Sequence, residues 1–341
     1  MVVTLAVMLL VVLSASAMAM PAQQVPDVDD AVAPRSLRAQ PQVLPHSDDA
    51  VEDDAAEDDA INAAAASSIR MIIDTDPGVD DATALVTLLS MQENAPTLLG
   101  IVTVAGNATA RDGATNVLNI LDIFGRTDIP VVIGLGSPYP GTGAAIHGPD
   151  GLWFQGLQNP QDLSGLSTDP VGFYCNSGDW DGATLLVLGP LTNLDAAYDA
   201  CPTVMATLGP VIVLGGAKVG GNITPVAEYN FWQDAGAAAR FIGDDNDTLS
   251  AATRALDVTI LPLDAFASLT IAQSDVDKLA SKGNAATQFI LPALQIYFDV
   301  QTTNGGSATL PDVAAAVLAI SPNYGESQSA LVKVLSGPGL A

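Results

Sequence analysis

Residues 69–82 read IRMIIDTDPGVDDA, and this stretch decides the fold. A short apolar run, Ile69 to Ile73, is followed by a turn at Pro77-Gly78 and by the start of a helical pattern near Asp80 or Asp81. A buried strand that passes through a tight turn into a helix is the repeating unit of α/β proteins. The stretch therefore predicts the strand, turn and helix that open the folded part of the chain.

The same alternation of apolar runs and helical segments continues downstream. Amphipathic or Ala-rich segments at 82–91 and 114–124 separate further apolar runs, which are interpreted as buried strands at 98–104, 130–133, 184–188 and 211–214. Strands that alternate with helices form largely parallel sheets covered on both faces. We therefore predict an α/β fold with a largely parallel sheet flanked by helices, in which a ligand binds beyond the carboxyl ends of the strands.

The whole chain is strongly acidic. Its 341 residues include 38 acids and 11 lysines or arginines, which gives a net charge of −27. Such a charge repels the phosphates of nucleic acids and anionic membrane surfaces. We therefore expect no nucleic-acid partner. The length suits one principal domain, since domains usually have about 100 to 250 residues.

The first 20 residues have the character of a targeting segment. They carry no charge, are strongly apolar from Val2 to Leu13, and then contain small residues that suit cleavage. This pattern is typical of a secretory signal peptide, although the usual basic start is missing. A membrane anchor is the alternative, but it needs roughly 20 apolar residues, more than this run provides. We predict a signal peptide over 1–20, no stable membrane anchor and a secreted, extracellular protein.

Residues 21–68 form an acidic segment of low complexity. They contain 11 acids, two arginines and almost no large apolar side chains. Such a composition cannot bury a core, so we predict a disordered leader or propeptide rather than a metal site. The folded domain is predicted over 69–341.

Cys175 and Cys201 are the only cysteines of the chain. In an oxidising compartment they could pair, whereas two free buried thiols are the alternative, and their spacing does not decide between these. The glycosylation sequon at Asn246 lies in a polar stretch and could carry a glycan in a eukaryotic host. Two further sequons begin at Asn107 and Asn222.

Four aspartates stand within eight residues at the predicted turn, at positions 74, 76, 80 and 81. Carboxylates crowded this closely repel each other unless a cation neutralises them, and a hard divalent ion is the natural partner. Asp80 or Asp81 alone could be a helix cap. Four acids exceed what capping requires, so the stretch predicts a metal site.

Two other classes with Asp-rich loops fit this stretch poorly. An EF-hand loop that starts at Asp74 needs Gly at its sixth position and Glu at its twelfth, where this chain has Val79 and Leu85. Phosphatases of the haloacid dehalogenase type also begin with a strand and Asp-x-Asp, but Pro77-Gly78 and the adjacent Asp80-Asp81 do not match their motif. A phosphohydrolase would also need cations for its phosphate, and residues 69–341 contain only nine lysines or arginines.

The stretch DTDPGVDDA at 74–82 resembles the signature of the inosine-uridine preferring nucleoside hydrolase family. Further matches follow in the family's order: VTVAGN at 102–107, IHGPDGL at 146–152, LGPLTNL at 188–194, NITPVAEYN at 222–230 and PDVAA at 311–315. The likeness covers about residues 69 to 323. It implies a Rossmann-like nucleoside hydrolase fold and a Ca²⁺-dependent enzyme of purine or pyrimidine nucleoside catabolism, which cleaves the N-glycosidic bond of ribonucleosides to free base and ribose.

The resemblance also implies roles for single residues. Ca²⁺ would be held by the carboxylates of Asp76, Asp81 and Asp312 and by the backbone carbonyl of Leu188, and Asp76 would be the catalytic general base. Substrate contacts would fall on Asp80, Asn107, His147, Asn222, Glu228, Asn230 and Asp312. From residue type alone, Asn107, Asn230 and His147 could equally be turn or loop residues. Five aromatic residues could line a base pocket or the core, namely Trp153, Phe231, Trp232, Tyr297 and Phe298.

Pro311 departs from the better-known pattern of the family. In many members a His at this position protonates the leaving base, and Pro311 has no proton to donate. His147 as an acid and the tryptophans as stacking partners are the candidates to replace it. The alternative function is therefore a secreted nucleoside- or ribose-binding protein that keeps the metal site without turnover. The expected partner is a small ribonucleoside, and the sequence is compatible with a homo-oligomer.

Overall fold

A computed structural model describes residues 69–92, 94–138, 143–176, 180–243, 256–330 and 332–334. The signal peptide predicted over 1–20, the leader predicted over 21–68 and the sequon at Asn246 lie outside the described residues. Among the helices of the described ranges, none is both long and apolar enough to span a bilayer.

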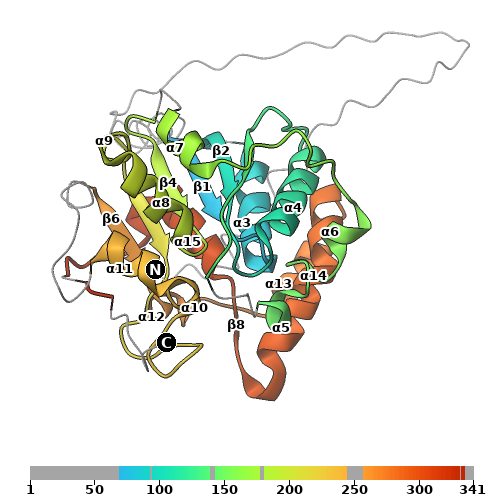
Figure 1. The fold of residues 1–341 in the computed structure, drawn as a ribbon. Helices are drawn as coiled ribbons and strands as arrows, with labels where there is room; N and C mark the ends of the chain where they lie inside the picture. Colours follow the sequence, from blue (N-terminus) through green and yellow to red (C-terminus); the bar gives the residue numbers. More distant parts are fainter. Residues whose placement is uncertain are drawn as a thin grey trace, which may run out of the picture.

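Six parallel strands form the central sheet (Figure 1). Their order across the sheet is β3 (Val131–Ile133), β2 (Thr97–Thr103), β1 (Arg70–Thr75), β4 (Thr184–Val187), β5 (Val211–Leu214) and β6 (Val258–Leu261). The chain builds outward from β1 to β3 and then returns to the other side of β1 with β4. The strand order therefore reverses between β1 and β4, and ligands of α/β proteins bind at such a switch point.

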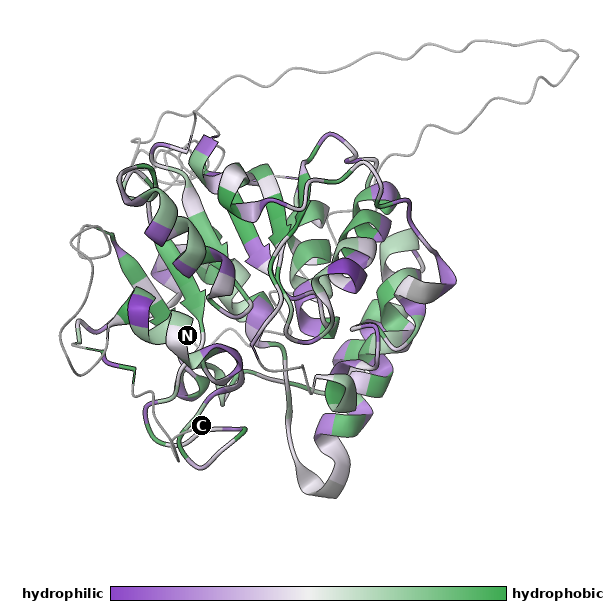
Figure 2. Cartoon of the chain, in the orientation of Figure 1, coloured by the Kyte–Doolittle hydropathy of each residue, from purple (hydrophilic) through white to green (hydrophobic). Residues whose placement is uncertain are grey.

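Both faces of the sheet carry helices, which confirms the predicted architecture. Successive residues of a strand point to opposite faces. Met71 and Ile73 of β1 join the apolar cluster under α3 (Val79–Ser90), α4 (Ala110–Ile123), α14 (Ala285–Thr302) and α15 (Pro311–Ile320). Ile72 joins the opposite cluster, under α7 (Pro170–Asn176), α8 (Thr192–Ala200) and α11 (Ala235–Ile242). Figure 2 shows the strands as apolar and the outer helices as mixed, as expected for a sheet buried on both faces.

Shorter elements connect these layers. They are the helices α5 (Ala144–His147), α6 (Gln155–Gln158), α9 (Pro202–Met205), α10 (Tyr229–Gln233), α12 (Leu263–Phe266) and α13 (Gln273–Ala280), the 3-10 turns η2 (Thr303–Gly305) and η3 (Pro322–Tyr324), and the antiparallel pair β7 (Thr270–Ile271) and β8 (Ala308–Thr309). A disulfide joins Cys175 in α7 to Cys201, which follows α8, with 5.7 Å between their Cα atoms. Of the two alternatives for the cysteines, the structure shows pairing.

Candidate metal and active site

Four predicted site carboxylates lie where β1 ends and where two helices begin. Asp76 follows β1, Asp80 and Asp81 are in the first turn of α3, and Asp312 is in the first turn of α15, which packs against α3. All four side chains are buried. Oxygens of Asp80, Asp81 and Asp312 lie within 4.8 Å of one another. The positive ends of two helix dipoles favour carboxylates at this place but do not neutralise several of them.

The carboxylate oxygens of this cluster fit a divalent cation. One oxygen each of Asp76, Asp80 and Asp312 is buried and has no hydrogen-bond partner among the described residues. Buried polar atoms without partners are rare in folded proteins because each costs about 1–3 kcal/mol or more. Crowded carboxylate oxygens are also the donors that hard ions such as Ca²⁺ prefer.

The pKa values of these carboxyls respond to the same crowding. Burial, followed by the charge of Asp80, raises the pKa of Asp81 to about 7. Burial and the charge of Asp81 hold the pKa of Asp76 well above its usual range, and burial with the charge of Asp80 does the same for Asp312. In the absence of a cation, therefore, the cluster retains protons that free carboxylic acids lose.

Two glycines leave the space that Asp76 occupies. A Cβ atom on Gly106 would lie 2.0 Å from Asp76 Oδ2, and one on Gly189 would lie 3.0 Å from Asp76 Oδ1. These glycines follow β2 and β4, the strands on either side of β1. The amide of Asn107 donates to Asp76 Oδ2 at 2.8 Å. The loops of both neighbouring strands thus fix this carboxylate, while its Oδ1 stays available.

Asp81 is held by three donors. The hydroxyl of Thr75 donates to Oδ1, and Oδ2 accepts from the amide of Gly78 at 3.0 Å and from Nδ2 of Asn107 at 3.1 Å. The bond to Gly78 closes the first turn of α3, so Asp81 both caps the helix and points its carboxylate at the cluster. Asn107, predicted to contact ribose, also positions Asp76 and Asp81.

Asp80 contacts two ring systems. The hydroxyl of Tyr297 donates to Asp80 Oδ2 at 3.0 Å, and His147 Nδ1 lies 3.6 Å from Asp80 Oδ1. Because His147 Nδ1 accepts the amide proton of Val79 at 3.1 Å, the neutral ring carries its proton on Nε2. Burial lowers the pKa of His147, so the ring is neutral at pH 7. From sequence, Tyr297 was a candidate for a base pocket or the core, and its hydrogen bond to Asp80 was not foreseen.

Asp74 lies next to the cluster and is completely buried. Its Oδ2 accepts hydrogen bonds from the hydroxyl of Tyr174 at 2.7 Å and from Nδ2 of Asn193 at 3.0 Å. Burial raises the pKa of Asp74 to about 7. Asn193 belongs to the LGPLTNL segment, whereas no feature of the sequence pointed to Tyr174.

The remaining predicted residues surround the ends of β4 and β5. Glu228 caps α10 by accepting the amides of Asn230 and Phe231, and it also accepts the amide of Gly216. Asn230 Nδ2 donates to the carbonyl of Leu188 at 2.7 Å and to that of Leu214 at 3.2 Å.

Asn222 occupies a different environment from these buried residues. It is exposed, in the loop that precedes α10. Its contact with ribose stays a prediction.

Two consecutive aromatic residues beside His147 adopt the left-handed backbone region. Trp153 has φ of 49° and Phe154 has φ of 72°. Asp150 holds this turn, because its Oδ1 accepts the amide of Phe154 at 2.7 Å and that of Leu152 at 3.2 Å. Bulky residues rarely adopt this conformation, and such strain is concentrated at functional sites.

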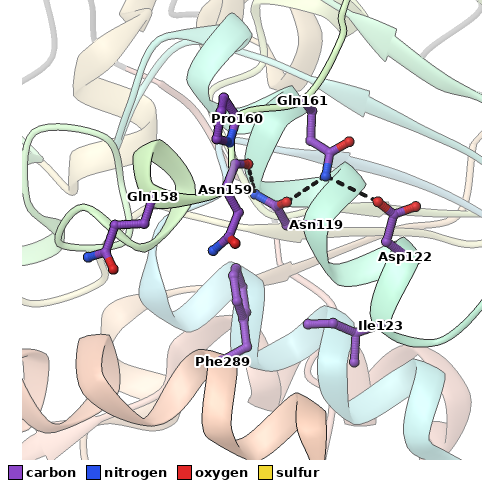
Figure 3. A pocket seen from close by; sticks show the side chains of 8 residues that line it. All are labelled: Asn119, Asp122, Ile123, Gln158, Asn159, Pro160, Gln161 and Phe289. Carbon is purple, nitrogen blue, oxygen red and sulfur yellow. Dashed lines mark hydrogen bonds between the residues drawn. The ribbon is translucent and has the colours of Figure 1, made fainter.

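A separate cavity of about 490 Å³ lies between α4, residues 158–161 and α14 (Figure 3). Its polar side chains bond one another: Gln161 Nε2 donates to Asn119 Oδ1 and Asp122 Oδ2, and Asn119 Nδ2 donates to the carbonyl of Asn159. It contains none of the predicted site residues. The carboxylate cluster, with its unpartnered oxygens, is therefore the better candidate site.

Fold and site together are those of an α/β protein with a buried carboxylate cluster that could hold a metal ion near the switch point between β1 and β4. The sequence model described as "Inosine-uridine preferring nucleoside hydrolase" matches residues 71–339, and the chain belongs to this family. Its members hydrolyse ribonucleosides, so the protein is a ribonucleoside N-ribohydrolase.

Individual relatives agree with this assignment. The protein named probable uridine nucleosidase 2 of Arabidopsis thaliana is 31% identical over 241 residues, which cover 69% of this chain and 71% of the relative. Uridine nucleosidase 1 of the same plant is 28% identical over 273 residues, 78% of each chain. A solved plant nucleoside hydrolase has a TM-score of 0.61 at 27% identity and covers 75% of this chain and 79% of its own.

Proposed function

We propose that the protein is a secreted, Ca²⁺-dependent ribonucleoside hydrolase in which Asp76 is the general base. The observation that carries this proposal is the group of buried carboxylates with unpartnered oxygens at the switch point. Asp76, Asp81, Asp312 and the carbonyl of Leu188 are the proposed ligands. The Leu188 carbonyl accepts one hydrogen bond from Asn230, which leaves its second lone pair for an ion.

Asp76 suits the role of general base by its position. Its Oδ2 is fixed by Asn107, while Oδ1 has no hydrogen-bond partner among the described residues and can take a proton from water. A bound Ca²⁺ would offset the repulsion between the carboxylates and make a neighbouring water more acidic. The remaining negative charge of the cluster favours the positive charge that develops on ribose as the N-glycosidic bond breaks.

The ribose hydroxyls are proposed to contact Asp80, Asn107, Asn222, Glu228, Asn230 and Asp312. Carboxylates and amides in such number offer the donors and acceptors that a polyol requires. The hydroxyl of Tyr297 holds the side chain of Asp80 in place, and Glu228 caps α10, the helix that contains Asn230. Rigid placement of these groups lowers the entropic cost of reaching the transition state.

The leaving base needs a proton or a stacking partner that Pro311 does not supply. Pro311 is the first residue of α15 and has neither a side-chain proton nor an amide proton. His147 is a candidate in the site, because its neutral ring carries its proton on Nε2 and can donate a hydrogen bond from that atom. We assign His147 a role in orienting the substrate through Nε2.

The disulfide supports secretion. Disulfides form and persist in oxidising compartments, and the bond between Cys175 and Cys201 agrees with the signal peptide predicted over 1–20. The names of the Arabidopsis relatives place uridine first among the substrates to test.

One assay tests the proposed activity and its cation. The purified chain is incubated with uridine, cytidine, inosine, adenosine and guanosine, in Ca²⁺ or in EDTA, and free ribose is measured as reducing sugar. We expect release of ribose in Ca²⁺ and its loss in EDTA. Asp76→Ala should abolish turnover, whereas Asp128→Ala, at an exposed residue paired with Arg126, is the matched control.

The same assay separates the enzyme from the alternative, a nucleoside-binding protein without turnover. Binding of Ca²⁺ and nucleoside without release of ribose from any of the five substrates would favour the binding protein and contradict the hydrolase. Turnover that EDTA leaves unchanged would contradict the Ca²⁺ requirement.

A further inference from the structure

The disulfide lies close in the chain to the residues that hold Asp74. The hydroxyl of Tyr174 donates to Asp74 Oδ2 at 2.7 Å, and Tyr174 directly precedes Cys175. The second donor, Asn193 Nδ2 at 3.0 Å, comes from the first turn of α8, and Cys201 follows the last residue of the same helix. The disulfide thus links the two helices that each supply one donor to Asp74.

Helices α7 and α8 also pack against each other. The side chain of Tyr174 is completely buried, and its ring makes an edge contact with Phe173 at 5.6 Å between centroids. Asn193 is equally buried, and it bonds the carbonyl of Thr103 and the amide of Leu135. Both donors are therefore buried and held by contacts of their own, and the covalent link restrains α7 at its end.

Asp74 in turn connects two proposed ligand segments. It precedes Asp76 by two residues, and its backbone carbonyl accepts the amide proton of Leu188 at 2.8 Å. A displacement of Asp74 would therefore move both the Asp76 segment and the Leu188 segment. Partners in the outer shell of metal sites commonly change metal affinity by about 10- to 100-fold when they are removed.

We propose that the disulfide between Cys175 and Cys201, acting through Tyr174 and Asp74, positions the Ca²⁺ site and makes its affinity depend on the redox state of the chain. The inference rests on the proposed Ca²⁺ site. A dithiol reductant would break the sulfur–sulfur bond, leave two thiols on the protein and itself become a disulfide. Tyr174 is then the positioning residue through which reduction weakens the site.

The first test measures Ca²⁺ binding to the oxidised full chain by calorimetric titration. Tyr174→Phe keeps the ring and the disulfide but removes the donor to Asp74, so we expect Kd for Ca²⁺ to rise about 10-fold. Tyr198→Phe is the matched control, because Tyr198 is a buried tyrosine of α8 whose hydroxyl faces the carbonyl of Met205. Equal affinities for the two variants would overturn the role of Tyr174.

The second test asks whether the disulfide acts through Tyr174. Cys175→Ser/Cys201→Ser should also raise Kd for Ca²⁺. In the triple variant that adds Tyr174→Phe, the total rise in Kd relative to wild type should be smaller than the product of the two separate fold-changes. A variant with a lower Tm but the Ca²⁺ affinity of wild type, measured well below its Tm, would show a purely structural disulfide and overturn the inference.

Two further measurements keep the inference separate from folding defects and from the proposed activity. If the serine variant does not fold, Ca²⁺-loaded wild type is treated with a dithiol and mixed with a chelator, and unchanged Ca²⁺ release would overturn the redox dependence. Ribose release is assayed in parallel. If the Ca²⁺ affinity changes with these variants but no nucleoside is hydrolysed, the result supports this inference and contradicts the proposed function. If a chain that binds no Ca²⁺ still hydrolyses nucleosides, the result contradicts both the Ca²⁺ site and this inference.

Discussion

Removing Ca²⁺ should make the stability of the protein depend steeply on pH, and the sign follows from the buried carboxyls. The pKa of Asp81 rises from an ordinary 3.8 to about 7 in the folded, metal-free protein. The folded state then holds a proton that the unfolded chain has released. Stability from this proton is fully present below pH 3.8 and is lost as the pH rises to about 7.

The magnitude follows from the same shift. About three pKa units at roughly 1.4 kcal/mol each correspond to a loss of about 4 kcal/mol for Asp81 alone between acid pH and pH 7. At the proposed site, bound Ca²⁺ would replace the proton and favour the charged carboxylates. The stabilisation by Ca²⁺ should therefore grow as the pH rises, while the Ca²⁺-loaded protein depends less on pH.

The assay is urea unfolding followed by circular dichroism, at several pH values from about 5 to about 8, in EDTA or in excess Ca²⁺. Asp128→Asn, which changes an exposed carboxylate, is the control and should leave the difference between the two series unchanged. Equal stabilisation by Ca²⁺ at both ends of the pH range, or a metal-free protein that gains stability with rising pH, would refute the reasoning.

Three substitutions test single contacts of the site. Asp76→Asn should lower kcat by about 10²- to 10⁴-fold through loss of the base, yet raise metal-free stability at pH 8 because one like charge is gone, as steady-state kinetics and urea unfolding would show. Gly106→Ala places a Cβ atom 2.0 Å from Asp76 Oδ2 and should cost about 10²-fold in kcat/KM, whereas Gly136→Ala meets open space and should not. Tyr297→Phe removes the donor to Asp80 and should raise KM for the preferred nucleoside about 10-fold; an unchanged KM would exclude Tyr297 from positioning the ribose contact.

The strands could be predicted from sequence where burial on both faces produces a continuous apolar run. The interior strands β1, β2, β4 and β5 lie within one or two residues of their predicted bounds. Strand β6 was missed because it lies at the edge of the sheet and its residues are only partly buried. A half-buried run of four residues carries too little signal against its surroundings.

The candidate site was predictable in the part that is local in sequence. Asp76, Asp80 and Asp81 stand together in the chain, so their mutual repulsion could be inferred before any fold was known. Asp312 lies far from them in sequence, and only the family resemblance placed it in the cluster. Tyr174 is an ordinary aromatic residue whose role depends on where α7 packs, which no local pattern encodes.

The long stretch of chain between Asp81 and Asp312, two of the proposed Ca²⁺ ligands, has a consequence for the folding and unfolding rates. The carboxylate cluster forms only when the starts of α3 and α15 are in contact, so an unfolded or half-folded chain lacks the complete proposed cation site. An ion that binds only the finished arrangement stabilises the native state without stabilising an earlier transition state. If α15 docks after the folding transition state, Ca²⁺ should lower the unfolding rate much more than it raises the folding rate. The ion would then increase the kinetic stability of the folded protein.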